Sequence, residues 1–370
     1  MTPDLPAAMR FFERGWLSSN NVLFTGEETA LVDSGYVTHS AQTLALVRHA
    51  LGERPLDRLL NTHLHSDHCG GNAALQAAYG CRTAIPASEA AKVAAWDEAA
   101  LSYRGTGQQC ARFTCDALLA PGQQLLLGGM PWQVLGAPGH DPHALLLFCP
   151  QEGILIAGDA LWENGFGVVF PELEGESGFD EVGATLDLIA TLDARLVIPG
   201  HGRMFTDVPG ALQRAYSRLA YLSADPKRNA ENAVKVLVKF LLLERQSIAL
   251  ADVPGLLAGI PVVRSAMRQM DVASLAQDQA LAERVGSCRQ RPARQAAHLT
   301  SRRTPIDQVD AGTTLAQDRK VGGFPAHASD APVSTAKPID PSYMTLANWA
   351  IASLVRAKAA RIDGDFLLDR

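Results

Sequence analysis

Three histidines and one aspartate lie within six residues of this chain, and this density of metal-binding side chains constrains the fold more than any other feature. The stretch 61–72 reads Asn-Thr-His-Leu-His-Ser-Asp-His-Cys-Gly-Gly-Asn. His63 and His65 are two residues apart, so on an extended segment both side chains point the same way and can converge on one ion. If a helix begins at Asp67, that residue and His68 face a second point nearby. Burying four such groups together is costly without a cation, so we favour a metal site over a polar loop of solvated histidines.

The segments around this motif predict alternating strands and helices. An apolar run at 56–60 predicts a strand that leads into the motif, and residues 39–51 before it have helical spacing. A strand, a helix and a second strand in this order are typical of layered α/β domains. Further strands are expected at 21–24, 29–35, 125–127, 132–135, 144–148, 154–158 and 194–198, and further helices at 72–78, 88–101 and 179–192.

The motif at 63–68 resembles the first metal motif of the metallo-β-lactamase-fold hydrolase superfamily. Three later turns are similar to the metal-binding turns of that family, and each follows an expected strand. These turns are Pro138-Gly139-His140, Gly158-Asp159 and Pro199-Gly200-His201. The resemblance covers roughly residues 15–205 and implies an α/β fold, the four-layer αβ/βα sandwich of the family, followed by a small helical region.

The resemblance also implies a site for two metal ions. The ligands it implies are His63, His65 and His140 for one ion, Asp67, His68 and His201 for the other, and Asp159 as the carboxylate shared by both. Asp33, in a segment similar to the early Val-Asp-x-Gly of the family, is expected to support the site from behind. His143 is expected to be a hydrogen-bonding partner or a plain loop residue. The mixed nitrogen and oxygen ligands suit Zn²⁺ best, with iron or manganese as alternatives.

The expected ligand set points to a catalytic site. Each ion has too few protein ligands to close its coordination shell, and such openness is typical of catalytic metals. Two ions about 3.5–4 Å apart lower the pKa of a shared water towards about 7, and the resulting metal-bound hydroxide would attack the substrate. Asp67 is the candidate catalytic residue, because it could also orient that hydroxide or accept its proton. We therefore expect a dinuclear-metal hydrolase.

Two residues narrow the expected substrate within the resemblance. Asp159 argues against a true β-lactamase, which usually lacks the shared carboxylate, and His65 argues against the di-iron redox branch, which usually has a carboxylate there. A glyoxalase-II-like or lactonase-like hydrolase of a small thioester, ester or lactone remains, although the basic residues with which glyoxalase II holds glutathione are not recognised here. The alternative is a metal-dependent phosphodiesterase or ribonuclease of the same fold, which would grip nucleic acid with the arginines at 289–303.

Length and composition add expectations about the rest of the chain. The 370 residues divide into an expected metal-binding domain at 1–205, a helical domain or cover at 206–286, a flexible linker at 287–341 and a terminal helix at 342–370. A net charge of −6 disfavours nucleic acid and favours a small-molecule substrate. The sequence contains no uninterrupted apolar run of about 18 residues, so we expect no membrane span. Six cysteines without a CxxC pair favour a cytoplasmic protein with reduced thiols, and a homodimer is left open.

Overall fold

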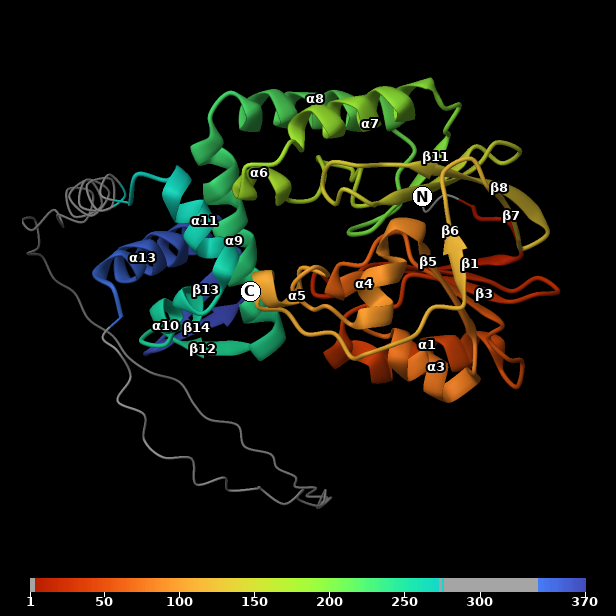
Figure 1. Ribbon diagram of the computed structural model, residues 1–370, viewed down its shortest axis with the longest axis horizontal. Helices are drawn as coiled ribbons and strands as arrows, with labels where there is room; N and C mark the ends of the chain where they lie inside the picture. Colours follow the sequence, from red (N-terminus) through yellow and green to blue (C-terminus); the bar gives the residue numbers. More distant parts are fainter. Residues whose placement is uncertain (1–3, 273–274, 276–338) are drawn as a thin grey trace, which may run out of the picture. The chain divides into compact units, whose positions relative to one another are not determined.

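Two β-sheets that pack face to face make up the part of the chain that contains the histidine motif (Figure 1). The structure is a computed structural model and describes residues 4–272, 275 and 339–370. The first sheet contains, in spatial order, β1 (Met9–Phe12), β2 (Asn21–Phe24), β3 (Ala30–Val32), β4 (Arg58–Leu60), β5 (Arg82–Pro86) and β6 (Ala117–Leu119). The second contains β11 (Leu196–Pro199), β10 (Ile154–Gly158), β9 (Leu145–Cys149), β8 (Met130–Gly136) and β7 (Gln124–Leu127).

Alternation along the strands explains why helices cover the outer face of each sheet. In β2, Phe24 packs between the two sheets, whereas Leu23 points to the other side. In β10, Ile156 packs between the sheets and Leu155 points outward. The helices that bury these outward faces are α1 (Ser40–Leu51) and α3 (Asn72–Tyr79) on the first sheet, and α7 (Phe179–Thr191) and α8 (Val208–Ser223) on the second. The four-layer αβ/βα sandwich expected from the resemblance is confirmed (Figure 1).

The elements in the sandwich match the predicted ones closely where a strand is an apolar run, and less well elsewhere. The helix expected at 88–101 is shorter, because α4 (Ala90–Ala95) ends where Trp96 adopts a left-handed backbone conformation with φ 52°. Its ring packs against Tyr103 and Phe113, with 6.0 and 5.4 Å between ring centroids. The sequence does not predict β5, because Arg82–Pro86 lacks the apolar run that marks the predicted strands. The remaining short helices are η1 (Val37–His39), α2 (Ser66–Cys69), η2 (Ala87–Glu89), α5 (Tyr103–Thr106) and α6 (Pro171–Glu174).

Helices dominate the chain after α8, as the sequence predicts. The elements are α9 (Pro226–Arg245), β12 (Ser247–Ala249), α10 (Val253–Ala258), α11 (Pro261–Gln269), α13 (Pro341–Arg356), β13 (Ala360–Asp363) and β14 (Phe366–Asp369). Both long helices begin in the same way. Asp225 accepts a hydrogen bond from the backbone N–H of Lys227 at the start of α9, and Asp340 accepts one from Ser342 at the start of α13. In each case a proline occupies the first helical position, where its missing N–H costs nothing.

The end of the chain differs from the expected terminal helix. That helix was expected to run over 342–370, but α13 ends at Arg356 and the residues after it form the hairpin β13–β14. β14 also pairs with β12, so this end of the chain is stabilised by a small three-stranded sheet. Nearly all of the expected linker at 287–341 lies outside the described residues. The described residues all belong to one compact unit, so the domain boundaries near 205 and 286 stay predictions.

One structural test concerns membranes. In the described ranges 4–272 and 339–370, no single helix is both long enough and apolar enough to cross a bilayer. Only the adjoining segments Leu250–Ala258 and Pro261–Gln269 meet that criterion when they are taken together, and they are bent by 89° relative to each other.

Candidate metal centre

The strand directions bring the predicted ligands to one edge of the sandwich. In the first sheet β3 runs parallel to β4, and in the second β10 runs parallel to β11. β8 has the same direction as β10, because each is antiparallel to β9 between them. The predicted ligands follow the carboxyl ends of these strands: residues 63–68 after β4, His140 after β8, Asp159 after β10 and His201 after β11. A site at this edge therefore draws on both sheets.

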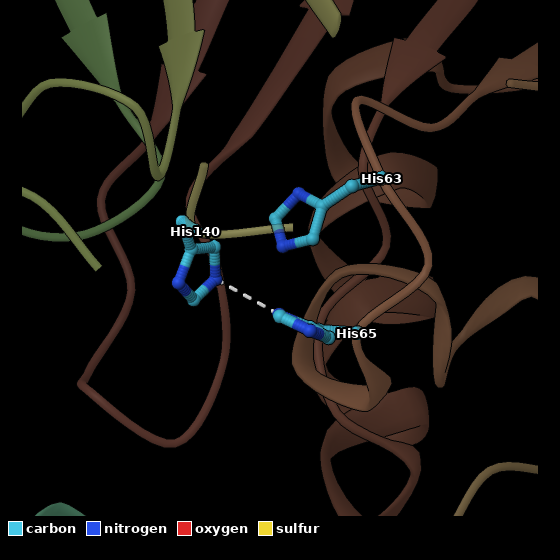
Figure 2. Close-up of side chains that lie close together, drawn as sticks. All are labelled: His63, His65 and His140. Atoms are coloured by element: carbon cyan, nitrogen blue, oxygen red, sulfur yellow. Dashed lines mark hydrogen bonds between the residues drawn. The ribbon is translucent and has the colours of Figure 1, made fainter. Parts of the chain in front are cut away.

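All seven predicted ligands lie in one cluster. Their nitrogen and oxygen atoms form three overlapping groups, and within each group the ligand atoms lie within 4.8 Å of one another. The groups are His63, His65 and His140; His63, His68 and Asp159; and Asp67, His68 and His201. Figure 2 shows the first group, in which the three imidazoles converge from two sides of the site and Nδ1 of His65 lies 2.8 Å from Nε2 of His140.

Asp159 is at the centre of this cluster. One carboxylate oxygen lies 3.4 Å from Nε2 of His68, and the other lies 3.4 Å from Nε2 of His140 and 3.7 Å from Nε2 of His201. Its oxygens thus face histidines of both expected metal sites, which is the position that a shared carboxylate requires. Asp67 lies on the His201 side, where its Oδ2 is 3.0 Å from Nε2 of His201.

The protonation of these side chains fits a cation at the centre. Burial, together with the neighbouring His68 and His65, holds the pKa of His63 well below its usual value. Burial likewise lowers the pKa of His140 to about 4. Both rings are therefore neutral at pH 7 and keep a lone pair. Nε2 of His63 and Nε2 of His68 are buried and have no hydrogen-bond partner among the described residues, so a metal ion would satisfy both.

His68 has the opposite electrostatic environment. Burial disfavours its charged form, but Asp33 and Asp159 outweigh burial and hold the pKa of His68 well above its usual value. This imidazole is therefore protonated unless another cation takes the place of its proton. The same buried carboxylates that favour the proton would favour a divalent ion, since metal binding and proton release are coupled at such sites.

Asp33 lies behind the cluster, in the supporting position that the sequence predicts. Its Oδ2 accepts a hydrogen bond from Nδ1 of His68 at 2.8 Å, and its Oδ1 accepts one from the backbone N–H of Thr62 at 2.9 Å. A proton held on Nδ1 leaves the lone pair of Nε2 free to face the cluster. His143 contacts Glu89 at 3.3 Å and is in none of the metal-binding groups of the described residues.

Replacing Asp33 by Asn should weaken metal binding by about 10–100-fold, because the amide no longer carries the charge that fixes the His68 tautomer. A competition titration of zinc against a fluorescent chelator measures this change. The control variant is Glu53→Gln, because Glu53 is exposed and belongs to none of the metal-binding groups of the described residues. Equal zinc affinity for Asp33→Asn and the control would contradict the supporting role.

Gly200 makes room for the cluster. A Cβ atom at this position would lie 2.1 Å from Oδ1 of Asp159 and 2.9 Å from Cε1 of His68, far inside contact distance. The backbone also passes close by, since the N–H of Gly200 donates a hydrogen bond to the carbonyl of Gly158 at 2.6 Å. The glycine of this turn is therefore required by the close approach of two proposed ligands.

The substitution Gly200→Ala should displace Asp159 and reduce both bound metal and turnover by at least about tenfold, while circular dichroism shows a folded protein. The matched control is Gly183→Ala in α7, where the nearest atom to the new Cβ is a Leu219 methyl at 3.6 Å. That control should be neutral or stabilising by up to about 1 kcal/mol. A Gly200→Ala protein with full metal content would show that the turn does not position Asp159.

Two tryptophans flank His201. The ring of Trp16 stacks on His201, with 5.4 Å between centroids and an angle of 5° between planes. Trp162 meets Trp16 edge-on at 5.3 Å and donates a hydrogen bond from Nε1 to Oδ1 of Asp159 at 3.2 Å. Trp162 follows the predicted ligand Asp159 by three residues, which was the available signal, and its side chain lines the cavity over the cluster. Trp16 lies outside any strand or helix, so only the tertiary structure reveals it.

A cavity of about 320 Å³ opens onto the cluster. It exposes five of the predicted ligands, namely His65, Asp67, His140, Asp159 and His201. Its other walls are mostly apolar and include Phe166 and Phe170 from the loop after β10, Phe240 from α9 and Leu354 from α13. The helices after His201 therefore complete a pocket over the predicted ligands, which has the size and character of a small-molecule site.

The layered fold and its buried cluster of imidazoles and carboxylates define the class of metal-dependent hydrolases. The family model described as metallo-beta-lactamase superfamily matches residues 14–201, and the chain belongs to this family. A metallo-beta-lactamase family protein from Thermus thermophilus has a similar fold, with a TM-score of 0.51, 23% sequence identity, and coverage of 75% of this chain and 96% of that one.

Two similar curated proteins are hydroxyacylglutathione hydrolases. A hydroxyacylglutathione hydrolase from Anaeromyxobacter dehalogenans (strain 2CP-C) is 31% identical over 243 residues, which cover 62% of this chain and 84% of the relative. A hydroxyacylglutathione hydrolase from Acidiphilium cryptum (strain JF-5) is 33% identical over 148 residues, or 40% of this chain and 50% of the relative. The chain thus spans most of the first relative and half of the second.

Proposed function

We propose that the protein hydrolyses a small thioester, ester or lactone at a centre of two divalent metal ions. The observation that carries the proposal is the convergence of seven ligand side chains from both sheets, five of which line an apolar cavity. The relatives named above support a thioester, because hydroxyacylglutathione carries its acyl group on sulfur. The mixed nitrogen and oxygen ligands favour Zn²⁺, with iron or manganese as alternatives.

We divide the seven side chains between the two proposed ions as the family resemblance implies. His63, His65 and His140 would hold one ion, Asp67, His68 and His201 the other, and Asp159 both. When bound, the ions supply Lewis acidity towards a carbonyl oxygen and lower the pKa of water. Among the described residues, no serine or cysteine side chain lines the cavity. Attack on the substrate by a water molecule is therefore the simplest mechanism for this pocket.

The residues around the ligands orient the substrate and exclude bulk water. Trp16 and Trp162 cover His201, and the indole N–H of Trp162 fixes one oxygen of Asp159. One carboxylate oxygen of Asp67 contacts Nε2 of His201, and Asp67 also lines the cavity. Its carboxylate is therefore within reach of a bound substrate. We assign Asp67 the second task of accepting a proton at this carboxylate during turnover, as general-base catalysis requires.

A panel of thioesters, lactones and phosphodiesters tests the proposal on the zinc-loaded full chain. We expect turnover of S-acyl thioesters or lactones and none of bis(p-nitrophenyl) phosphate or RNA. Turnover of the phosphodiesters alone would replace the proposal by the nuclease alternative, whose proposed basic grip at 289–303 lies outside the described residues. The small-molecule substrate class is thus tested directly, and the cytoplasmic location and homodimer stay predictions.

A further inference from the structure

Two basic side chains lie in the wall of the cavity without an acidic partner. Arg218 of α8 and Lys235 of α9 both line it. The third cation in this wall, Lys239, is already used, because its ammonium group contacts the carboxylate of Asp369 and the carbonyl of Ala359. Within the described residues, neither Arg218 nor Lys235 has a carboxylate oxygen within 4.0 Å.

Arg218 is held in position by contacts that leave its donors unused. The aliphatic part of its side chain packs over Gly165, where a Cβ atom would lie 2.6 Å from Cδ of the arginine. Its guanidinium carbon lies 5.6 Å from the centroid of the Phe166 ring, and both residues line the cavity. Nε of Arg218 is buried and has no hydrogen-bond partner among the described residues. A buried, unpaired guanidinium donor is costly, so a ligand that supplies an acceptor would be bound favourably.

Lys235 adds a second positive charge from the next helix. Its ammonium nitrogen lies 5.5 Å from the centroid of the Trp349 ring of α13. Burial is the main cause of its lowered pKa; nearby Arg218 and Arg356 add to the effect, and Glu231 partly offsets it. Because Arg218 and Lys235 line the same cavity with charges of the same sign, an anion bound there would be attracted by both.

We propose that Arg218 and Lys235 bind an anionic group, a carboxylate or a phosphate, at the end of an apolar substrate whose scissile bond lies at the ligand cluster. The inference rests on the proposed hydrolase function, because it takes this cavity to be the substrate site. It narrows the substrate to an amphiphilic acid. A neutral substrate leaves both cations unpaired. A zwitterion gains little, because the carboxylates in the cavity wall, Asp67 and Asp159, are proposed metal ligands.

Matched substrates that differ at one end test this on the zinc-loaded full chain. The probes are the S-acetyl thioesters of 6-mercaptohexanoate, of 6-mercaptohexyl phosphate and of heptanethiol. We expect kcat/KM to be about tenfold or more higher for an anionic probe than for the neutral one, as a charge-assisted hydrogen bond provides. The carboxylate and phosphate arms show which anion the site prefers. Equal kcat/KM for all three probes would overturn the inference.

Variants locate the selectivity. Arg218→Met and Lys235→Met should each remove most of the preference for the anionic probes and change kcat/KM for the neutral probe by less than about threefold. Arg218→Lys keeps the charge and should retain part of the preference. The control is Arg264→Met on α11, an exposed position outside the cavity wall, which removes a charge and should change nothing. Equal losses on all probes in Arg218→Met would contradict a role in recognising the anion.

A binding measurement separates this inference from the proposed function. The ketone thioethers in which a 2-oxopropyl group replaces the acetyl group of each probe cannot be hydrolysed, and calorimetry gives their Kd on zinc-loaded protein. A preference of about tenfold for the anionic thioethers that is lost in Arg218→Met supports the anion site even if no thioester is cleaved. Cleavage of the thioesters without such a preference would leave the hydrolase proposal standing and reject the anion site.

Discussion

Removal of the metal ions should abolish hydrolysis and destabilise the fold together. Dialysis against a strong chelator is expected to lower kcat by about three orders of magnitude or more, since the ions contribute several kcal/mol to transition-state stabilisation. The Tm should fall by roughly 5–10 °C, because ligand binding to the native state alone adds about 4 kcal/mol at 1,000 times Kd. Activity assays and calorimetry on the same sample measure both effects.

The structural reason is the burial of the ligands. His63 and His68 are fully buried, each with an Nε2 atom that no described residue satisfies. Without a metal ion, these nitrogens stay buried without a hydrogen bond, and the proton on His68 is the counter-charge for Asp33 and Asp159. Re-addition of Zn²⁺ should restore both activity and Tm, which controls for irreversible damage by the chelator. A chelated protein that keeps full turnover would refute the metal-dependent account.

Loss of the central carboxylate should have the second large effect. Asp159→Asn removes the negative charge that faces histidines of both proposed ion sites, at 3.4 Å from His68 and from His140. We expect the protein to retain at most one ion per chain and to lose about three orders of magnitude in kcat. Elemental analysis of the purified variant and steady-state kinetics with the preferred thioester or lactone provide the two readings.

A neighbouring aspartate gives the matched control for this variant. Asp141 Oδ2 lies 3.6 Å from Nε2 of His65, and Asp141 Oδ1 accepts a hydrogen bond from the backbone N–H of His143. Asp141 belongs to none of the metal-binding groups of the described residues. Asp141 is too far from His65 for a hydrogen bond, unlike Asp33 from His68, so Asp141→Asn should keep two ions and lose less than about tenfold in kcat. If Asp159→Asn had the same metal content and the same kcat as Asp141→Asn, Asp159 would not be a shared ligand.

The sequence predicts the sandwich and the ligand cluster because both depend on local patterns. Apolar runs such as that in Asn21–Phe24 identify the strands, and the spacing of His63, His65 and His68 is visible in one short stretch. His140 and His201 are recognised because each ends a strand at a Pro-Gly turn. Metal-binding turns of this kind are short enough that their geometry follows from the chain itself.

Features that depend on distant contacts could not be predicted in this way. Trp16 reaches His201 across 185 positions of the chain, and nothing in its local sequence marks it. Nothing in the sequence distinguishes Arg218 from the other arginines. Only its packing against Gly165 and Phe166 in the folded chain places it at the cavity. The hairpin after Arg356 was missed because its strand β13 exposes three of its four residues and so lacks a clear apolar face.

An X-ray structure of the zinc-loaded full chain, with anomalous diffraction data collected at the zinc edge, tests the central claim most directly. We predict two anomalous peaks about 3.5–4 Å apart. One should lie among His63, His65 and His140, and the other between Asp67 and His201. No peak at this edge of the sandwich, or peaks bound only by residues elsewhere, would contradict the account.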